Sequence, residues 1–219
     1  KPRWDETKDA LVASATVVDG GARANADFEV PSAAFNALLA FNAAELAEVT
    51  GDRKMASMAA ELAELLTATW SEQHLTWTDG GHTSAAAPTL EGLLPALVVG
   101  ERRQVDQALA QTADREVYAA PFGLRQTSAR CPDYQPDAYW RGPSWPPLDY
   151  LMWLAALRAG RESLGADIAS RTVRGASRSG MAEYWNPETG RGRGAIPQTW
   201  AGLAWLMGRG GSGRLRRGV

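Results

Sequence analysis

The sequence contains little of what metal centres and disulfide-linked domains require. Among its 219 residues there is one cysteine, Cys131, and there are two histidines, His74 and His82. A single thiol cannot form an internal disulfide, and these few side chains exclude a cysteine-rich zinc site or a histidine cage. We interpret both histidines as ordinary loop residues and Cys131 as a free thiol. We therefore expect no metal, no cofactor and a cytoplasmic location.

Long hydrophobic runs and an excess of charge of one sign are also missing. The longest apolar stretches, such as residues 93–99, are far shorter than the roughly 20 residues that a membrane-spanning helix needs, and no export signal is evident. The 23 Lys and Arg residues nearly balance the 25 Asp and Glu residues, for a net charge of -2. Such a chain has no strong field to attract nucleic acid or an anionic membrane. We expect a soluble domain, or a piece of a larger one, with neither as a partner.

Helical periodicity dominates the first half of the sequence. Apolar residues recur at helical spacing over residues 31–50 and again over 52–66. Between them, Gly51 supplies a helix stop and Asp52 an N-cap. The pattern predicts two helices joined by a tight hairpin.

The same arrangement recurs twice further along the chain. Gly100 separates helices expected near residues 88–99 and 101–113, and Gly160 marks a third hairpin. Alternating strand patterns are nearly absent, apart from a short extended piece at residues 75–78. Helix pairs separated by long loops predict an all-α protein of the α-solenoid or α/α toroid type.

Two long loops, residues 114–144 and 180–196, are rich in aromatic residues, proline and glycine. Long loops on a rigid helical frame are where binding chemistry usually lies. Six of the nine tryptophans lie in the last 80 residues of the chain, which include the second of these loops. These two loops are therefore the parts of the chain in which a binding site is expected.

The first candidate motif is YWRGPSWPP, residues 139–147, which precedes a helix expected to start at its prolines. Indole faces such as those of Trp140 and Trp145 stack on the apolar faces of sugar rings, and Arg141 offers a fork of donors. Gly142 permits close approach of a ligand to the backbone. The alternative is that both tryptophans are buried packing residues at a helix start.

The second candidate motif is EYWNPETG, residues 183–190, in which residues 186–190 have the composition of a turn. This turn would hold Glu183 just outside a helix, where burial tunes a carboxyl pKa and a positioned water can be deprotonated. The alternative is a surface glutamate beside a turn. Residues 195–200 then predict a proline-started helix that aims Gln198 and Trp200 at the same place.

A third motif, IPQTW, occupies residues 196–200. Together, the three motifs resemble the closing half of the bacterial mannosylglycerate and glucosylglycerate hydrolases, which are relatives of glycoside hydrolase family 63. Residues 28–52, with Phe35-Asn36-Ala37, resemble a helix-pair segment of that family. The resemblance covers essentially residues 1–207. Residues 208–219 are expected to form a flexible basic tail.

The resemblance implies an (α/α)6 barrel, of which this chain is expected to be the C-terminal half. Its funnel would bind one small α-glucoside or α-mannoside and hydrolyse the bond with inversion, using two carboxyl groups and no cofactor. Glu183 matches the general base of the family. The expected substrate-binding residues are Tyr139, Trp140, Arg141, Gly142, Trp145, Trp185, Gln198 and Trp200.

The general acid is where the sequence departs from the family pattern. The motif places this aspartate two residues before Lys1, so we expect it, with the N-terminal half of the barrel, upstream in the same chain or in a partner. Asp5 is the nearest carboxylate present, but the motif does not select it. Asp133 and Asp137, beside the first motif, are fallback candidates.

A second departure concerns the part of the substrate beyond the sugar. Residues 11–27 are short and alanine-rich, whereas relatives have a longer, aromatic connection that helps to grip glycerate. Arg141 suits an acidic aglycone, and a neutral aglycone is equally compatible.

Three alternatives stay open at this point. A trehalase-like enzyme or an oligosaccharide glucosidase would use similar aromatic platforms and acids. A non-catalytic sugar-binding module, or a degenerate fragment, would explain the missing acid. An all-helical scaffold for protein partners fits the hairpins but leaves the clustered aromatic residues unexplained.

Overall fold

The computed structural model describes residues 2–17, 23–25, 30–79 and 88–210. The α-helices are α1 (Pro2–Ala13), α2 (Ala33–Thr50), α3 (Arg53–Thr67), α4 (Arg102–Ala113), α5 (Pro146–Arg158), α6 (Glu162–Ser179) and α7 (Leu203–Gly210), and η2 (Leu90–Leu97) and η3 (Thr199–Gly202) are 3-10 helices. The two-residue strands are β1 (Thr16–Val17), β2 (Arg23–Ala24), β3 (Trp70–Ser71), β4 (Thr76–Trp77), β5 (Ala119–Ala120), β6 (Gly123–Leu124), β7 (Tyr184–Trp185) and β8 (Gly192–Arg193). His82 and nearly all of the expected tail lie outside the described residues.

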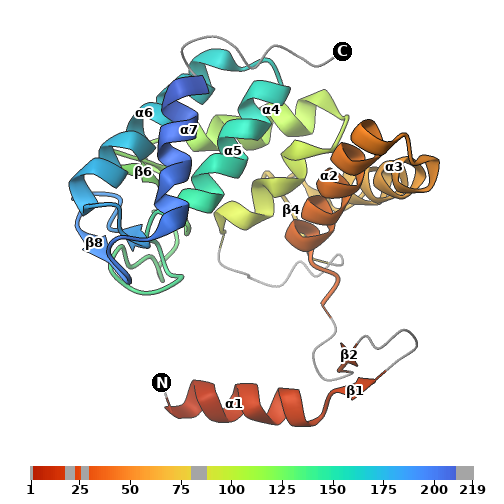
Figure 1. Ribbon diagram of the computed structural model, residues 1–219, viewed down its shortest axis with the longest axis horizontal. Coiled ribbons are helices and arrows are strands. Elements are labelled where there is room, and N and C mark those ends of the chain that lie inside the picture. Colours follow the sequence, from red (N-terminus) through yellow and green to blue (C-terminus); the bar gives the residue numbers. More distant parts are fainter. Residues whose placement is uncertain (1, 18–22, 26–29, 80–87, 211–219) are drawn as a thin grey trace.

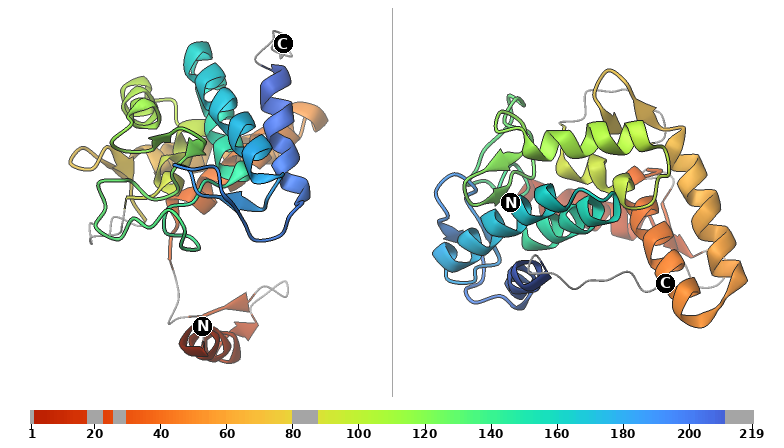
Figure 2. Two further views of the ribbon diagram at one scale, coloured as in Figure 1. Left: turned by 90° about the vertical axis from the view of Figure 1, so that its left-hand side faces the viewer. Right: turned by 90° about the horizontal axis from the view of Figure 1, so that it is seen from above.

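The helices pack as neighbouring pairs, which confirms the expected all-α architecture of a partial α/α toroid. Helix α2 packs on α3, α5 on α6, and α7 against α6, while η2 lies between α2 and α5 (Figure 1). Figure 2 shows the same body from the side and from above, with α1 and the β1–β2 hairpin standing apart from it. Asp5, on α1, is therefore not brought to the loop that precedes α5 or to the loop that follows α6.

Local capping explains the first helix hairpin. Ser32 caps α2, and Gly51 ends it in the left-handed conformation at φ 73°, with its N–H bonded to the Ala47 carbonyl at 2.8 Å. A left-handed residue after a helix favours glycine because glycine has no Cβ to clash. The Asp52 carboxylate then accepts from Lys54 N at 2.8 Å and so caps α3.

Two expected helices differ in the structure. The helix expected over residues 88–99 is the shorter 3-10 helix η2, which contains Pro95. Proline lacks an N–H and clashes with the preceding turn of an α-helix. Near the C-terminus, no helix starts at Pro197, whose peptide bond with Ile196 is cis. Helix η3 begins at Thr199, and α7 continues to Gly210, past the expected boundary of the tail.

The strands form four small antiparallel hairpins, of which the sequence indicated only β3–β4, through the extended piece at residues 75–78. Two-residue strands are too short for alternation of polar and apolar residues to reveal them. One of the missed hairpins, β7–β8, pairs Tyr184 with Arg193 and carries the second motif.

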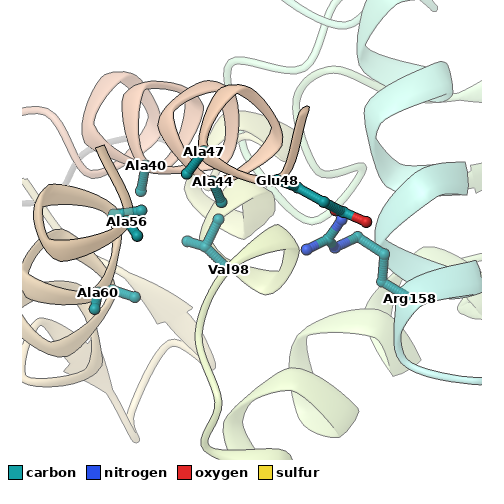
Figure 3. A pocket seen from close by; sticks show the side chains of 10 residues that line it. Ala40, Ala44, Ala47, Glu48, Ala56, Ala60, Val98 and Arg158 are labelled. Atoms are coloured by element: carbon teal, nitrogen blue, oxygen red, sulfur yellow. The ribbon is translucent and has the colours of Figure 1, made fainter. Parts of the chain in front are cut away.

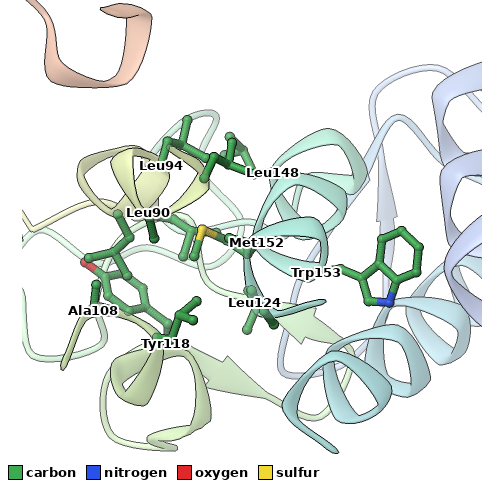
Figure 4. Packing of buried hydrophobic residues seen from close by; sticks show 14 of the residues in the cluster. Leu90, Leu94, Ala108, Tyr118, Leu124, Leu148, Met152 and Trp153 are labelled. Atoms are coloured by element: carbon green, nitrogen blue, oxygen red, sulfur yellow. The ribbon is translucent and has the colours of Figure 1, made fainter. Parts of the chain in front are cut away.

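The main core lies between η2, α4 and α5. Figure 4 shows Leu90, Leu94, Tyr118 and Met152 gathered on one side of α5, with Trp153 on its other side, and each of these side chains is almost fully buried. Burying one such large apolar side chain contributes about 1.5–3 kcal/mol. This core includes Leu148 at the start of α5 and Leu124 of the β5–β6 hairpin, so it fixes the two elements that the motif loops contact.

Within the described ranges, no helix is both long and apolar enough to cross a membrane. The same residues contain no group of three or more His, Cys, Asp and Glu side chains placed to hold a metal ion. Cys131 is buried.

Candidate functional site

The first motif folds into an aromatic cluster with the second. The rings of Trp140 and Trp145 stack almost in parallel, with centroids 4.0 Å apart, and Trp145 also stacks on Tyr184 at 4.4 Å. Tyr139 and Trp200 approach Trp145 edge-on at 5.3 and 6.0 Å. We call these five residues the aromatic cluster.

The sequence left two interpretations for these tryptophans, an exposed sugar platform and a buried packing residue. Trp140 has the exposure that the first requires, and Trp145 is buried as the second requires. Trp145 is only 2% exposed and is a packing residue at the start of α5, whereas Trp140 is 44% and Tyr139 59% exposed. Trp140 has a left-handed backbone, with φ 55°, which is uncommon outside glycine. The exposed rings available to a ligand are therefore those of Tyr139 and Trp140.

Backbone hydrogen bonds align the loops beneath the cluster. Ser144 N donates to Trp185 O at 2.9 Å, and Trp185 N donates back to Ser144 O at 3.2 Å. On the other side, Gln126 N donates to Pro143 O at 3.3 Å, and Leu90 N donates to Gln126 O at 2.7 Å. Backbone hydrogen bonds thus join four separate segments of the chain next to the aromatic cluster.

Glu183 lies two residues before Trp185 and three residues after the Gly180 cap of α6. It is therefore just outside a helix, as the composition of the following turn predicted. Its N–H donates to Ala195 O at 2.8 Å, and its Oε2 accepts from Ala195 N at 3.0 Å. Trp200 Nε1 donates to Glu183 O at 2.7 Å. Oε1 has no hydrogen-bond donor among the described residues, so one oxygen is fixed and the other is available.

A partly buried ion pair anchors the first loop to the second. Glu188 Oε1 accepts from Arg125 Nε at 2.6 Å and from Tyr134 Oη at 2.7 Å. Burial and the hydrogen bond to Glu188 raise the pKa of Tyr134, so this hydroxyl keeps its proton and donates. Neither Arg125 nor Tyr134 was predicted, since neither lies in a motif.

The same tyrosine explains Gly142, which has φ 151°. A Cβ at this position would come within 2.7 Å of Tyr134 Cδ2. The close approach that requires glycine here is thus made by the ring of Tyr134. Arg141 next to it is exposed, and its side chain has no hydrogen-bond partner among the described residues.

Trp185, like Trp145, was expected to contact the substrate but is buried in the structure. It is completely buried, its Nε1 donates to Phe122 O, and a Cβ on Gly175 would collide with its ring. On β7, successive side chains point to opposite faces, so Tyr184 faces the aromatic cluster and Trp185 the core. Trp185 is therefore not a wall of a sugar site.

Gln198 and Trp200 both lie close to the cluster, although in different roles. Trp200 contacts the backbone of Glu183, as described above. Gln198 N donates to Met181 O at 2.8 Å, and its Oε1 accepts from Thr199 N at 2.7 Å at the start of η3. Its side-chain amide nitrogen has no hydrogen-bond partner within the described part of the chain.

Of the two fallback acid candidates, Asp137 is not suited to protonate a leaving group. Asp137 forms an ion pair with Arg193 on β8, and hydrogen bonding to that guanidinium lowers the pKa of Asp137. It is therefore ionised at neutral pH. Asp133 is an exposed loop residue.

Another carboxylate was missed, although it had a signal in the sequence. Asp149 lies in the first turn of α5, in the otherwise apolar stretch 146–157, and is completely buried. Desolvation by burial raises its pKa to about 7, against hydrogen bonds from Thr172, Ser144 and Leu124 that lower it. A charged residue inside an apolar helical stretch is the pattern that could have revealed it.

None of these residues lines the two apolar cavities of the helical body. One cavity of about 470 Å³ lies between α2 and α3 and is lined mainly by alanines, with Glu48 and Arg158 at one end (Figure 3). A second, of about 530 Å³, lies between α6 and α7. The candidate site is instead the aromatic cluster together with its sequence neighbours Arg141 and Glu183.

The fold and the site together define a class, the glycoside hydrolases built on an α/α toroid. The model of the mannosylglycerate hydrolase MGH1-like glycoside hydrolase domain matches residues 1–201. The chain belongs to this family. The resemblance drawn from the three motifs is thereby confirmed.

Curated relatives agree with this family. The chain is 27% identical over 145 residues to a mannosylglycerate hydrolase of Thermus thermophilus, which covers 65% of this chain and 35% of that protein. It is 36% identical over 86 residues to a glucosylglycerate hydrolase of Mycolicibacterium hassiacum, covering 39% of this chain and 19% of that protein. The chain thus spans about a third or less of these relatives.

A solved structure supports the fold. A family 63 mannosylglycerate hydrolase from Thermus thermophilus, in complex with Tris, superposes with a TM-score of 0.73 at 24% identity. The match covers 84% of this chain and 46% of that one.

Proposed function

We propose that the protein containing this chain hydrolyses a small α-glucoside or α-mannoside, such as glucosylglycerate or mannosylglycerate, with inversion. The observation that carries the proposal is the Glu183 carboxylate, with Oε2 fixed by Ala195 N and Oε1 available, in a residue that directly precedes Tyr184 of the aromatic cluster and whose backbone oxygen accepts from Trp200 Nε1. The family and the names of the relatives support it.

Glu183 acts in this scheme as the general base. Its free oxygen takes a proton from a water molecule, which attacks the anomeric carbon from the face opposite the leaving group. A carboxylic acid on the other side protonates the leaving oxygen, and the two carboxyl groups lie roughly 6.5–9.5 Å apart in inverting enzymes. This acid is expected upstream of Lys1, and neither Asp137 nor Asp5 replaces it. The reaction requires no cofactor.

The exposed residues of the first motif bind the substrate in this proposal. The faces of Tyr139 and Trp140 contact the apolar face of the sugar. Arg141, which has no acidic partner among the described residues, binds the carboxylate of an acidic aglycone such as glycerate.

The rest of the barrel is proposed to cover the outer face of α2. Phe35, Leu39, Leu46 and Val49 lie on one side of this helix and are all exposed. A stripe of large apolar residues at helical spacing is typical of a helix that packs on another. The N-terminal half of the toroid is the occupant that the length of the relatives supports.

The proposal is tested by assaying the full-length protein with glucosylglycerate, mannosylglycerate, trehalose and an α-glucose oligosaccharide. Proton NMR of the first product formed gives the stereochemistry, and a β-anomer is expected. Glu183→Gln should abolish turnover and leave sugar binding intact in calorimetry, because the base acts on water and does not hold the ring. Glu116→Gln, at an exposed loop carboxylate, is the matched control and should be fully active.

Each other outcome selects an alternative. Preference for trehalose or the oligosaccharide would support the trehalase-like or glucosidase reading. Sugar binding without hydrolysis would identify a non-catalytic module, and absence of both would leave the helical scaffold. Turnover retained in Glu183→Gln would show that the base is another residue.

A further inference from the structure

We propose that Asp149 is a positioning residue of the site, which acts through Ser144 to hold the Trp145 ring in register with β7, the strand that directly follows Glu183. This inference rests on the proposed function, which it deepens. Asp149 touches no substrate in it.

Asp149 collects hydrogen bonds from three separate parts of the fold. Its Oδ2 accepts from Ser144 Oγ at 3.0 Å and from Thr172 Oγ1 on α6 at 2.7 Å, and its Oδ1 accepts from Leu124 N on β6 at 3.3 Å. No cation is among these partners. Placing a carboxylate in the interior is costly unless its hydrogen bonds are made, so the three donors hold this side chain in one place.

Ser144 is the partner that links Asp149 to the site. Its hydroxyl faces the interior and Asp149, while its backbone forms the two-way bridge with Trp185. Trp145 follows it directly and enters the aromatic cluster. On the opposite strand, Tyr184 stacks on Trp145, and Glu183 precedes Tyr184. A shift of Ser144 would thus move the aromatic stack and the proposed base relative to each other.

Gly123 leaves room for this contact. A Cβ at Gly123 would collide with Ser144 Oγ and come within 2.7 Å of Asp149 Oδ2. The β5–β6 hairpin therefore packs closely against the Ser144–Asp149 pair, and this close packing requires glycine at position 123.

The experiment compares kinetics of the full-length protein with the variants Ser144→Ala, Asp149→Asn and the double variant, on whichever α-glycoside it hydrolyses. Since a misplacement of about 1 Å at a reacting group can cost about 100-fold in rate, we expect kcat to fall about 10- to 100-fold in each single variant. KM should change less. The double variant should be no slower than Asp149→Asn, because both changes break the same link. Ser144→Thr, which keeps a hydroxyl, should restore most of the rate.

Thr112→Val is the matched control for loss of a buried hydroxyl. Thr112 lies on α4, is fully buried and donates to Leu109 O at 2.7 Å, away from the site. Its kcat should stay within about twofold of the parent, in keeping with independent effects at separate sites. Equal loss of kcat in Thr112→Val, multiplying effects in the double variant, or unchanged kcat in Ser144→Ala would overturn the proposal.

A spectroscopic readout separates this inference from the proposed function. The stacked Trp140 and Trp145 rings should give an exciton couplet in the far-ultraviolet circular dichroism. We expect Ser144→Ala to reduce this couplet and Thr112→Val to leave it unchanged, whether or not the protein hydrolyses a glycoside. An unchanged couplet in Ser144→Ala would refute the positioning role, and this holds even if Asp149→Asn does not fold.

Discussion

Replacing Asp149 with asparagine keeps the shape of the side chain and removes its ionisation. Burial raises the pKa of Asp149 from its ordinary value of 3.8 to about 7, so the folded protein keeps this proton up to about pH 7 while the unfolded chain releases it near pH 4. Between these values the folded state binds more protons than the unfolded state. The stability that the protonated carboxyl provides is therefore fully present below about pH 4 and is lost as the pH rises through about 7.

The magnitude follows from the difference between the two pKa values. One pKa unit corresponds to about 1.4 kcal/mol of differential stability. The shift from 3.8 to about 7 therefore changes the free energy of unfolding by about 4 kcal/mol, of which about 3 kcal/mol falls between pH 5 and pH 8. Because the side chain is completely buried, solvent screening does not reduce this figure. Relative to Asp149→Asn, the parent protein should therefore become less stable by about this amount from pH 5 to pH 8.

Urea unfolding of both proteins at several pH values measures this difference directly. Other shifted groups, such as Glu91, whose pKa burial raises, and Asp137, whose pKa Arg193 lowers, titrate in both proteins and cancel. A stability difference that stays constant from pH 5 to pH 8 would refute the reasoning, since it would show that Asp149 does not change its protonation in this range.

Three further predictions concern single contacts. Trp140→Ala should weaken sugar binding and lower the rate together, because it removes an exposed ring of the site, and unchanged kinetics would make that ring structural. Gly175→Ala should lower the free energy of unfolding by about 1–3 kcal/mol, the usual cost of overpacking, because its Cβ would meet the Trp185 ring; thermal unfolding equal to the parent would contradict this contact. Tyr134→Phe should cost about 1–2 kcal/mol in urea unfolding through the lost hydrogen bond to Glu188. Full stability of that variant would show that the hydroxyl contributes nothing to anchoring the loop.

The sequence by itself determined the features that depend on neighbouring residues. The α2–α3 hairpin follows from the Gly51 stop and the Asp52 cap, because capping satisfies backbone groups within a few residues. The start of α5 at its prolines was predictable for the same reason. Glu183 was located after the end of α6 because the turn at residues 186–190 has a clear composition.

Only the tertiary structure decided which side chains of the motifs face the site. Trp140, Trp145 and Trp185 are alike in sequence, yet one is exposed, one is sandwiched in the cluster and one lies in the core. Their positions depend on which segments pack against them, and those contacts join residues far apart in the chain, such as Ser144 with Trp185. The burial of Asp149 has the same origin, because its partners come from α6, from β6 and from the loop before α5. Long-range packing of this kind leaves no periodic pattern in a single sequence.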